Sequence, residues 1–149
     1  MVNTASIGGF QVNPAFHSGA YATTKYAVVA LSEALAHDLE GTGIGVSVLA
    51  PAAVDTHIYA SADSRPARFG GPHERPDTHF MADLLKDGLS GDQVGQRVVA
   101  AIKANELFVF THSPPRAWIE ARHRRLMDAF DRAEAWERTQ DAGGARRTG

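Results

Sequence analysis

The sequence GVSVLAPAAVDT at residues 45–56 decides the fold class. From Gly45 to Ala50 it contains a single polar side chain, that of Ser47, and therefore has no polar face. An uninterrupted run of this kind is typical of a strand that is buried on both faces, as parallel strands are. The proline at position 51 predicts a turn at the carboxyl end of this strand.

Upstream of this strand, the sequence predicts a shorter strand, a loop and a helix. Val2 to Ala5 is the expected strand, and the residues from Ser6 to Ala20 are rich in glycine, serine and proline, which is typical of a loop. A helix is expected from about Ser18 to Glu40, because apolar residues recur there at helical spacing. This spacing predicts one buried stripe along the helix, formed by Ala27, Val28, Leu31, Leu35 and Leu39.

Downstream, a long irregular segment precedes a second series of helices and strands. The segment from Pro51 to Asp77 is rich in proline and arginine, and loops of this length are usually functional lids or disordered. Ser90 and Gln93 have the spacing of a capping box, which predicts the start of a helix. The remaining expected elements are a short helix at about 78–86, a helix at 90–104 buried through Val94, Val98, Ala101 and Ile102, a strand at 107–111, and a charged amphipathic helix at 115–138. The alternation of strands and helices implies an α/β fold with a parallel sheet of about three strands and flanking helices.

The composition is that of a globular protein and argues against several kinds of partner. Hydrophobic residues make up 44% of the chain and charged residues 21%. A formal net charge of -2 gives no electrostatic reason to expect binding to nucleic acid or to an anionic membrane. Cysteine is absent and the seven histidines lack a zinc-like spacing, so no metal site is expected. The sequence has neither a long apolar run nor a signal-peptide pattern, so a cytoplasmic location is expected.

A tyrosine and a lysine one helical turn apart are the candidates for chemistry. Tyr21 and Lys25 are four residues apart, which places both side chains on one helix face, about 5–6 Å apart at their Cβ atoms. A tyrosine hydroxyl is a poor base at neutral pH, but a cation about 6 Å away stabilises the phenolate by roughly 3 kcal/mol at an effective dielectric constant of about 20. The pair could therefore transfer a proton. Taken alone, such a pair is more often a coincidence of the surface than a site.

The surrounding motifs favour the catalytic interpretation. In chain order they are VNTASIGG at 2–9, YATTK at 21–25, YAVVALSEAL at 26–35, and residues 45–56 quoted above. This ordered set resembles the short-chain dehydrogenase/reductase family over about the first sixty residues. The resemblance implies a Rossmann-like, doubly wound parallel sheet. It also implies an oxidoreductase that transfers hydride between NAD or NADP and an alcohol or ketone substrate.

The resemblance assigns a role to each matching residue. Tyr21 would be the general acid/base, Lys25 would support it and bind the nicotinamide ribose, and Ser6 would donate a hydrogen bond to the substrate oxygen. In the turn after the strand at 45–50, the backbone at Val54 and the hydroxyl of Thr56 would hold the nicotinamide carboxamide. The residues that contact the cofactor would be Tyr21, Lys25, Pro51, Val54 and Thr56. Subunits of the family often associate through the helix that corresponds to residues 26–40, so a homo-oligomer is expected.

Three departures from the family pattern accompany this resemblance. Ser6 lies fifteen residues before Tyr21, slightly farther than in the family, and Ala52 stands where a glycine commonly follows the proline. No glycine-rich phosphate-binding turn precedes Ser6. Residues 1–138 are therefore expected to be the carboxy-terminal half of the NAD(P)-binding domain, with 51–89 as the substrate lid and 139–149 as a disordered tail. That half alone is expected to be inactive, and a non-catalytic remnant that only associates with other subunits is the alternative.

Overall fold

The computed structural model describes residues 1–14, 18–72 and 78–144. The chain divides into two compact units, with the boundary between Ser113 and Pro114. The first unit contains strands β1 (Val2–Thr4), β2 (Ser47–Ala50) and β3 (Phe108–Phe110), and helices α1 (Gly19–Asp38), α2 (Thr78–Leu85) and α3 (Gly91–Lys103). It also contains the short 3-10 helices η1 (Ile7–Gly9), η2 (His57–Ser64) and η3 (Ala67–Phe69), and the second unit is built on α4 (Arg116–Gly144).

The three strands form one parallel sheet in the order β1-β2-β3. Leu49 of the central strand pairs with Thr4 on one side and with Val109 on the other. All four residues of β2 are buried, as the unbroken apolar run predicts. The predicted α/β class with a three-stranded parallel sheet is confirmed.

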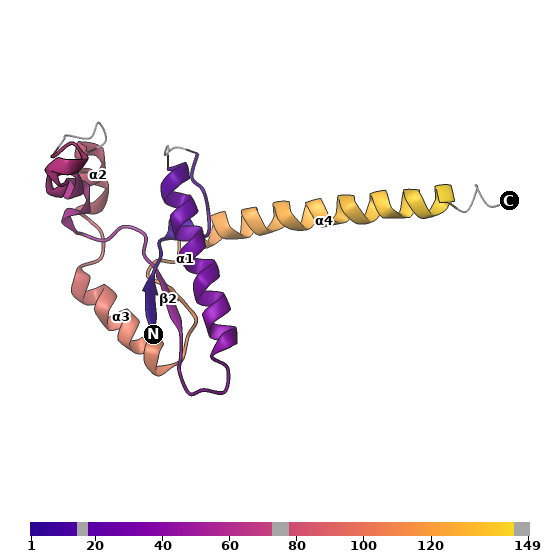
Figure 1. Ribbon diagram of the computed structural model, residues 1–149, viewed down its shortest axis with the longest axis horizontal. Coiled ribbons are helices and arrows are strands. Elements are labelled where there is room, and N and C mark those ends of the chain that lie inside the picture. Colours follow the sequence, from indigo (N-terminus) through magenta and orange to yellow (C-terminus); the bar gives the residue numbers. More distant parts are fainter. Residues whose placement is uncertain (15–17, 73–77, 145–149) are drawn as a thin grey trace. The chain divides into compact units, whose positions relative to one another are not determined.

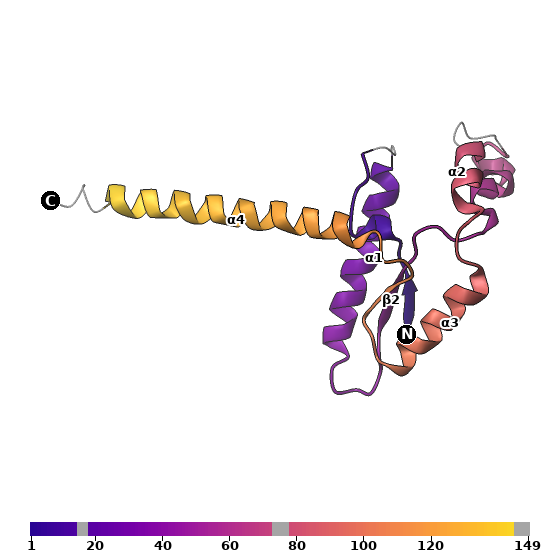
Figure 2. The same ribbon diagram turned by 180° about the vertical axis from the view of Figure 1, so that it is seen from behind.

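Helices cover both faces of this sheet (Figure 1). Successive residues of a strand point to opposite faces, and β2 uses both of its central side chains in this way. Val48 packs with Ala5 and Val29, under α1, whereas Leu49 packs with Val109 and the α3 residue Ala101. The view from behind shows the same arrangement, with β2 between α1 and α3 (Figure 2). The core therefore consists of two thin apolar layers that meet at β2.

One of the two crossover connections is left-handed. The strand order advances in one direction from β1 to β3, yet α1 and α3 lie on opposite faces of the sheet. Two such connections must have opposite hands, although about 98% of parallel crossovers are right-handed. The connection from β2 to β3 spans residues 51–107 and is long enough to pass around either edge of the sheet.

The buried face of α1 differs from the predicted stripe. The buried residues of α1 are Ala22, Val29 and Ser32. Of the predicted stripe, Val28 packs against the core, whereas Leu31 is 56% exposed. The small side chains of Ala22 and Ser32 let the helix lie close to the strands, which the larger leucines would prevent. Ser32 is fully buried, and its hydroxyl accepts a hydrogen bond from Asn3 of β1 at 3.0 Å. The same hydroxyl donates to the Val28 carbonyl within α1 at 2.7 Å, so the bond from Asn3 ties the helix to β1.

The predicted capping box at the start of α3 is confirmed. The Ser90 hydroxyl accepts from the backbone N–H of Gln93, and the Gln93 side chain accepts from the N–H of Ser90. Val94 and Val98 pack against the core with Ala101, as expected. Ile102 does not, because it lies on the outer side of the last turn and is 53% exposed.

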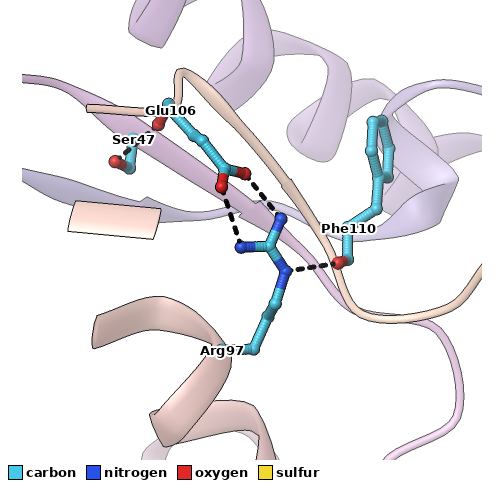
Figure 3. Close-up of polar contacts among 4 residues, drawn as sticks. All are labelled: Ser47, Arg97, Glu106 and Phe110. Atoms are coloured by element: carbon cyan, nitrogen blue, oxygen red, sulfur yellow. Dashed lines mark hydrogen bonds and ion pairs between the residues drawn. The ribbon is translucent and has the colours of Figure 1, made fainter. Parts of the chain in front are cut away.

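Arg97 joins α3 to both ends of β3 (Figure 3). Its guanidinium donates two hydrogen bonds to the Glu106 carboxylate, at 2.6 and 3.2 Å, and a third to the Phe110 carbonyl at 3.3 Å. The backbone carbonyl of Glu106 also accepts from the Ser47 hydroxyl at 2.8 Å, which adds β2 to the network. Hydrogen bonding to Arg97 holds the pKa of the Glu106 carboxyl below its ordinary value.

We expect Glu106→Gln to lower the melting temperature at pH 7 by a few degrees, and the difference from the wild type to be smaller at pH 3. The folded protein favours the ionised carboxyl, so its stabilising effect is present above the unfolded pKa of about 4.3 and is lost as the pH falls. Melting curves at both pH values measure this, with Glu33→Gln on α1 as the control. A difference between wild type and Glu106→Gln that is equally large at pH 3 would contradict the prediction.

The helix after Pro115 is longer than the sequence predicts. It was expected to end at Arg138, but α4 continues to Gly144. No proline or glycine interrupts the sequence before Gly143, so nothing local stops the helix earlier. The residues beyond 144 in the expected disordered tail lie outside the described part of the chain. Among the described residues, no helix combines the length and hydropathy needed to cross a membrane.

Candidate active site

The loops after the three strands meet at one edge of the sheet. Carboxyl ends of parallel strands lie at the same edge, which is where open α/β sheets bind their ligands. Two backbone hydrogen bonds tie the loops after β1 and β2 together, from Ala5 N–H to the Leu49 carbonyl at 2.8 Å and from Ile7 N–H to the Pro51 carbonyl at 2.9 Å. This edge therefore holds the candidate residues that the sequence places after strands.

Ser6 caps the short helix η1 directly after β1. Its Oγ accepts a hydrogen bond from the N–H of Gly8 at 3.1 Å, and its side chain is half-buried. The bond holds the hydroxyl in one orientation at the edge of the sheet. A serine Oγ that accepts in this way still carries a hydrogen that it can donate to a ligand.

Tyr21 and Lys25 lie on one face of the first turns of α1. The Lys25 Nζ is 5.7 Å from the centroid of the Tyr21 ring and donates a hydrogen bond to the Thr4 carbonyl at the end of β1, at 3.2 Å. An ammonium group has three donors, and the bond to Thr4 uses one of them. Tyr21 is 45% exposed, so its ring is open to a ligand from solvent.

Two glycines let η1 approach α1 closely enough to bring Ser6 to Tyr21. A Cβ atom on Gly8 would lie 3.4 Å from Cε1 of Tyr21 and 3.6 Å from Oγ of Ser6, so both groups lie next to Gly8. A Cβ atom on Gly9 would lie 2.7 Å from the Lys25 carbonyl oxygen. The structure thus brings Ser6, Tyr21 and Lys25 together, as the sequence predicts.

The loop after β2 is held from two directions. The N–H of Ala52 donates to the hydroxyl of Thr111, just after β3, at 3.3 Å. Val54 forms a parallel bridge with Leu89, through bonds that use the Asp55 N–H and the Ala53 carbonyl at 2.9 and 3.2 Å. The bridge does not use the peptide groups of Val54 itself, which point to the other side.

Residues 1–67 match the family model for short chain dehydrogenases. The chain is also 33% identical over 131 residues to 1-deoxy-11-beta-hydroxypentalenate dehydrogenase of Streptomyces exfoliatus, which covers 88% of this chain and 39% of that protein. Its fold matches a short chain dehydrogenase/reductase from Burkholderia phymatum, solved in complex with NAD, at a TM-score of 0.74 and 30% identity over 85% of this chain and 47% of the other. The chain belongs to the short-chain dehydrogenase/reductase family.

This short-chain dehydrogenase/reductase chain spans about half the length of the curated relatives it matches, or less, with shares of 47%, 43% and 39%. A second similar structure, a short-chain dehydrogenase from Sphingobium yanoikuyae in complex with NADPH, gives a TM-score of 0.55 at 25% identity and covers 85% of this chain and 44% of that one. The three-stranded sheet and its helices thus correspond to part of the family's Rossmann-like fold.

The residues present fit the nicotinamide end of a cofactor. The ammonium of Lys25 and the half-buried hydroxyl of Ser6 lie at the carboxyl edge of the sheet. The loop after β2 lies at the same edge, and the peptide groups of Val54 in this loop point away from the bridge to Leu89. The Thr56 hydroxyl donates to the Val54 carbonyl at 3.5 Å, which places it beside those groups. A carboxamide has an acceptor oxygen and an N–H donor group, so it requires both donors and acceptors around it. The groups of Val54 and Thr56 provide both kinds.

Two residues at this edge of the sheet were not anticipated from the sequence. The sequence places Gly9 only in a loop, but it is buried against the Lys25 backbone. Thr111 was expected only as the end of a strand, but its hydroxyl holds the loop after β2 and bonds His112 Nδ1 at 2.7 Å. The adjacent Gly8 and Gly9 were a usable signal for a close approach. No local signal marks Thr111, because its partner lies 59 residues away in the chain.

We expect Thr111→Val to speed the hydrogen exchange of the Ala52 amide by roughly fivefold to tenfold, because one hydrogen bond contributes about 1 kcal/mol. Valine keeps the shape of threonine and removes the hydroxyl that accepts from Ala52. Thr111→Ser retains the hydroxyl and should exchange like the wild type. Exchange measured by NMR tests this, and an Ala52 amide equally protected in the valine variant would show that the bond does not hold the loop.

Proposed function

We propose that this chain forms the proton-transferring part of an oxidoreductase that moves hydride between NAD or NADP and an alcohol or ketone substrate. The observation that carries the proposal is the placement of Ser6 Oγ and the Tyr21 ring next to Gly8, with the Lys25 ammonium 5.7 Å from the ring centroid. The similar structures that were solved with NAD and with NADPH support a nicotinamide cofactor.

In the proposed reaction, Tyr21 moves a proton to or from the substrate oxygen. During reduction its hydroxyl donates a proton to the carbonyl oxygen, and during oxidation the phenolate accepts one from the alcohol. The Lys25 ammonium lies close enough to favour the negative charge that remains on the tyrosine oxygen. Because Tyr21 is 45% exposed, water screens this attraction, and a bound ligand that excludes water would strengthen it.

Ser6 fixes the position of the substrate oxygen. Its Oγ accepts from Gly8, so its hydrogen can be donated to the substrate oxygen where negative charge develops. The same oxygen can then lie within reach of the Tyr21 hydroxyl, because both side chains lie next to Gly8. One group thus orients the oxygen while the other exchanges a proton with it.

The bound nicotinamide cofactor supplies or accepts the hydride. Lys25 would hold its ribose through the donors that the Thr4 bond does not use, and the Val54 backbone and Thr56 hydroxyl would hold its carboxamide. Pro51 would set the direction of this loop after β2, where its carbonyl is tied to Ile7. We propose a homo-oligomer for the natural polypeptide, through the outer face of α1.

A nicotinamide-coupled assay on the natural polypeptide that carries these residues tests the function. Absorbance of the reduced nicotinamide is followed with NAD or NADP and a panel of alcohols and ketones, and turnover with at least one pair is expected. Lys25→Met should raise the cofactor KM and lower kcat, because lysine serves both the ribose and the tyrosine. No turnover by the wild type with any pair, at saturating cofactor, would contradict the proposal.

A role confined to subunit association is the second candidate. The observation that favours it is the exposure of Leu31 on the outer side of α1, at 56%, where a partner helix would cover it. An association protein would form oligomers that Leu31→Glu disrupts, and it would show no turnover in the nicotinamide assay.

A further inference from the structure

One peptide group at the carboxyl edge of the sheet is hydrogen-bonded on both sides. The Pro51 carbonyl accepts from the N–H of Ile7 at 2.9 Å. The N–H of the same peptide belongs to Ala52 and donates to the Thr111 hydroxyl at 3.3 Å. The partners of this peptide follow β1 and β3, whereas the peptide itself follows β2. It therefore joins the loops after all three strands.

His112 extends this series of hydrogen bonds. Its Nδ1 bonds the Thr111 hydroxyl at 2.7 Å, a shorter distance than that from the hydroxyl to the Ala52 nitrogen. Both side chains are half-buried, and the hydroxyl has no third partner within the described part of the chain. The series thus begins at the imidazole and runs through the hydroxyl and the peptide to Ile7.

The donors in the series determine the direction of each hydrogen bond. The Ala52 N–H can only donate, so Oγ of Thr111 accepts from it. If Nδ1 of His112 also donated, the Thr111 hydrogen would have no acceptor among the described residues. All three groups are satisfied when the hydroxyl donates to an unprotonated Nδ1, so the neutral ring carries its hydrogen on Nε2.

We propose that His112 positions the loop after β2 for cofactor binding, by accepting a hydrogen bond from the Thr111 hydroxyl. A hydroxyl that donates is a better acceptor, because hydrogen bonds in a series polarise one another. His112 thereby strengthens the bond from Ala52 and holds the Thr111 side chain in the rotamer that accepts it. His112 acts through Thr111 and is a positioning residue, and its effect on the cofactor rests on the proposed function.

The tie at Ala52 limits the movement of Val54, whose backbone is proposed to hold the carboxamide. The bridge to Leu89 holds this backbone from the other side, through hydrogen bonds of 2.9 and 3.2 Å. With a weaker tie at Ala52 the loop is freer to pivot about the bridge, and a shift of about 1 Å in a group that positions a ligand is costly. Tyr21 and Lys25 lie on α1, outside this loop, so cofactor binding should suffer more than proton transfer.

Cofactor kinetics and amide hydrogen exchange on variants of the natural polypeptide test this role. His112→Phe removes the acceptor, whereas His112→Asn keeps one, because its Oδ1 is as many bonds from the backbone as Nδ1. We expect His112→Phe to raise the cofactor KM and the exchange rate of the Ala52 amide at least about threefold, with kcat within about twofold of the wild type. His112→Asn should stay within about twofold in all three quantities, and so should the control His37→Phe, at an exposed position in the last turn of α1.

Nitrogen NMR of the His112 ring tests the direction of the bond without any need for turnover. At a pH where the ring is neutral, its hydrogen should be found on Nε2. A hydrogen on Nδ1 of the neutral ring would overturn the inference, because the Thr111 hydroxyl would then not be the donor.

Three results on the variants would also overturn the inference. The first is wild-type exchange of the Ala52 amide in His112→Phe, and the second is an unchanged cofactor KM for this variant in a polypeptide that turns over. The third is His112→Asn as impaired as His112→Phe, because the acceptor would then not be what matters. Absence of turnover in the wild type would contradict the proposed function alone, since the ring and amide measurements still decide the role of His112.

Discussion

Replacing Tyr21 by phenylalanine is expected to lower kcat/KM for nicotinamide-dependent turnover by at least about 100-fold, because general acid–base catalysis contributes about 10²–10⁴-fold. The substitution removes only the hydroxyl of a ring that is 45% exposed. The ring, its packing beside Gly8 and its contact with Lys25 remain, so the melting temperature should stay that of the wild type. Steady-state kinetics and a melting curve on the natural polypeptide measure both quantities.

Tyr26→Phe is the matched control for this experiment. Tyr26 lies on the same helix and loses the same hydroxyl group, but it is not among the proposed catalytic residues. We expect it to retain turnover within a factor of a few. A Tyr21→Phe variant with more than half of the wild-type kcat/KM would contradict the assignment of Tyr21 as the proton-transferring group.

The second large effect is expected at Gly9. A Cβ atom there would lie 2.7 Å from the Lys25 carbonyl oxygen and 3.0 Å from both the Lys25 carbonyl carbon and Cγ2 of Val29. These neighbours are mostly backbone of α1 and cannot rotate away, so Gly9→Ala must push η1 and α1 apart. Overpacking of this kind typically costs about 1–3 kcal/mol. For a chain of this size that cost corresponds to a melting temperature lower by roughly 3–10 °C.

Gly9→Ala should also reduce turnover more than its loss of stability explains. Separating η1 from α1 moves Ser6 away from Tyr21, and a displacement of about 1 Å in a catalytic group can cost about 10²-fold in rate. Gly19→Ala, at the start of α1 with nothing within 4 Å of its Cβ position, is the control and should match or slightly exceed the wild-type melting temperature. A wild-type melting temperature for Gly9→Ala would show that η1 and α1 are not in close contact.

The sequence by itself predicted the elements and the pair of residues that share one helix turn. Gly45 to Ala50 has no polar face, which is typical of a strand covered on both sides, and β2 is such a strand. Tyr21 and Lys25 are four residues apart, so any regular helix brings them to one face. Ser90 and Gln93 specify a helix start through their own hydrogen bonds. In each case the determining interactions lie within a few residues of one another.

Only the tertiary structure decided which faces meet and which loops are held together. Periodicity predicted an apolar stripe on α1 that included Val28, which does pack against the core. The fully buried residues are instead Ala22, Val29 and Ser32, because the helix approaches the sheet most closely through small residues. The bond between Thr111 and Ala52 joins residues 59 positions apart. Local sequence patterns determine which side chains share a surface. The packing of distant elements, through close approach and the satisfaction of buried hydrogen bonds, determines what that surface contacts.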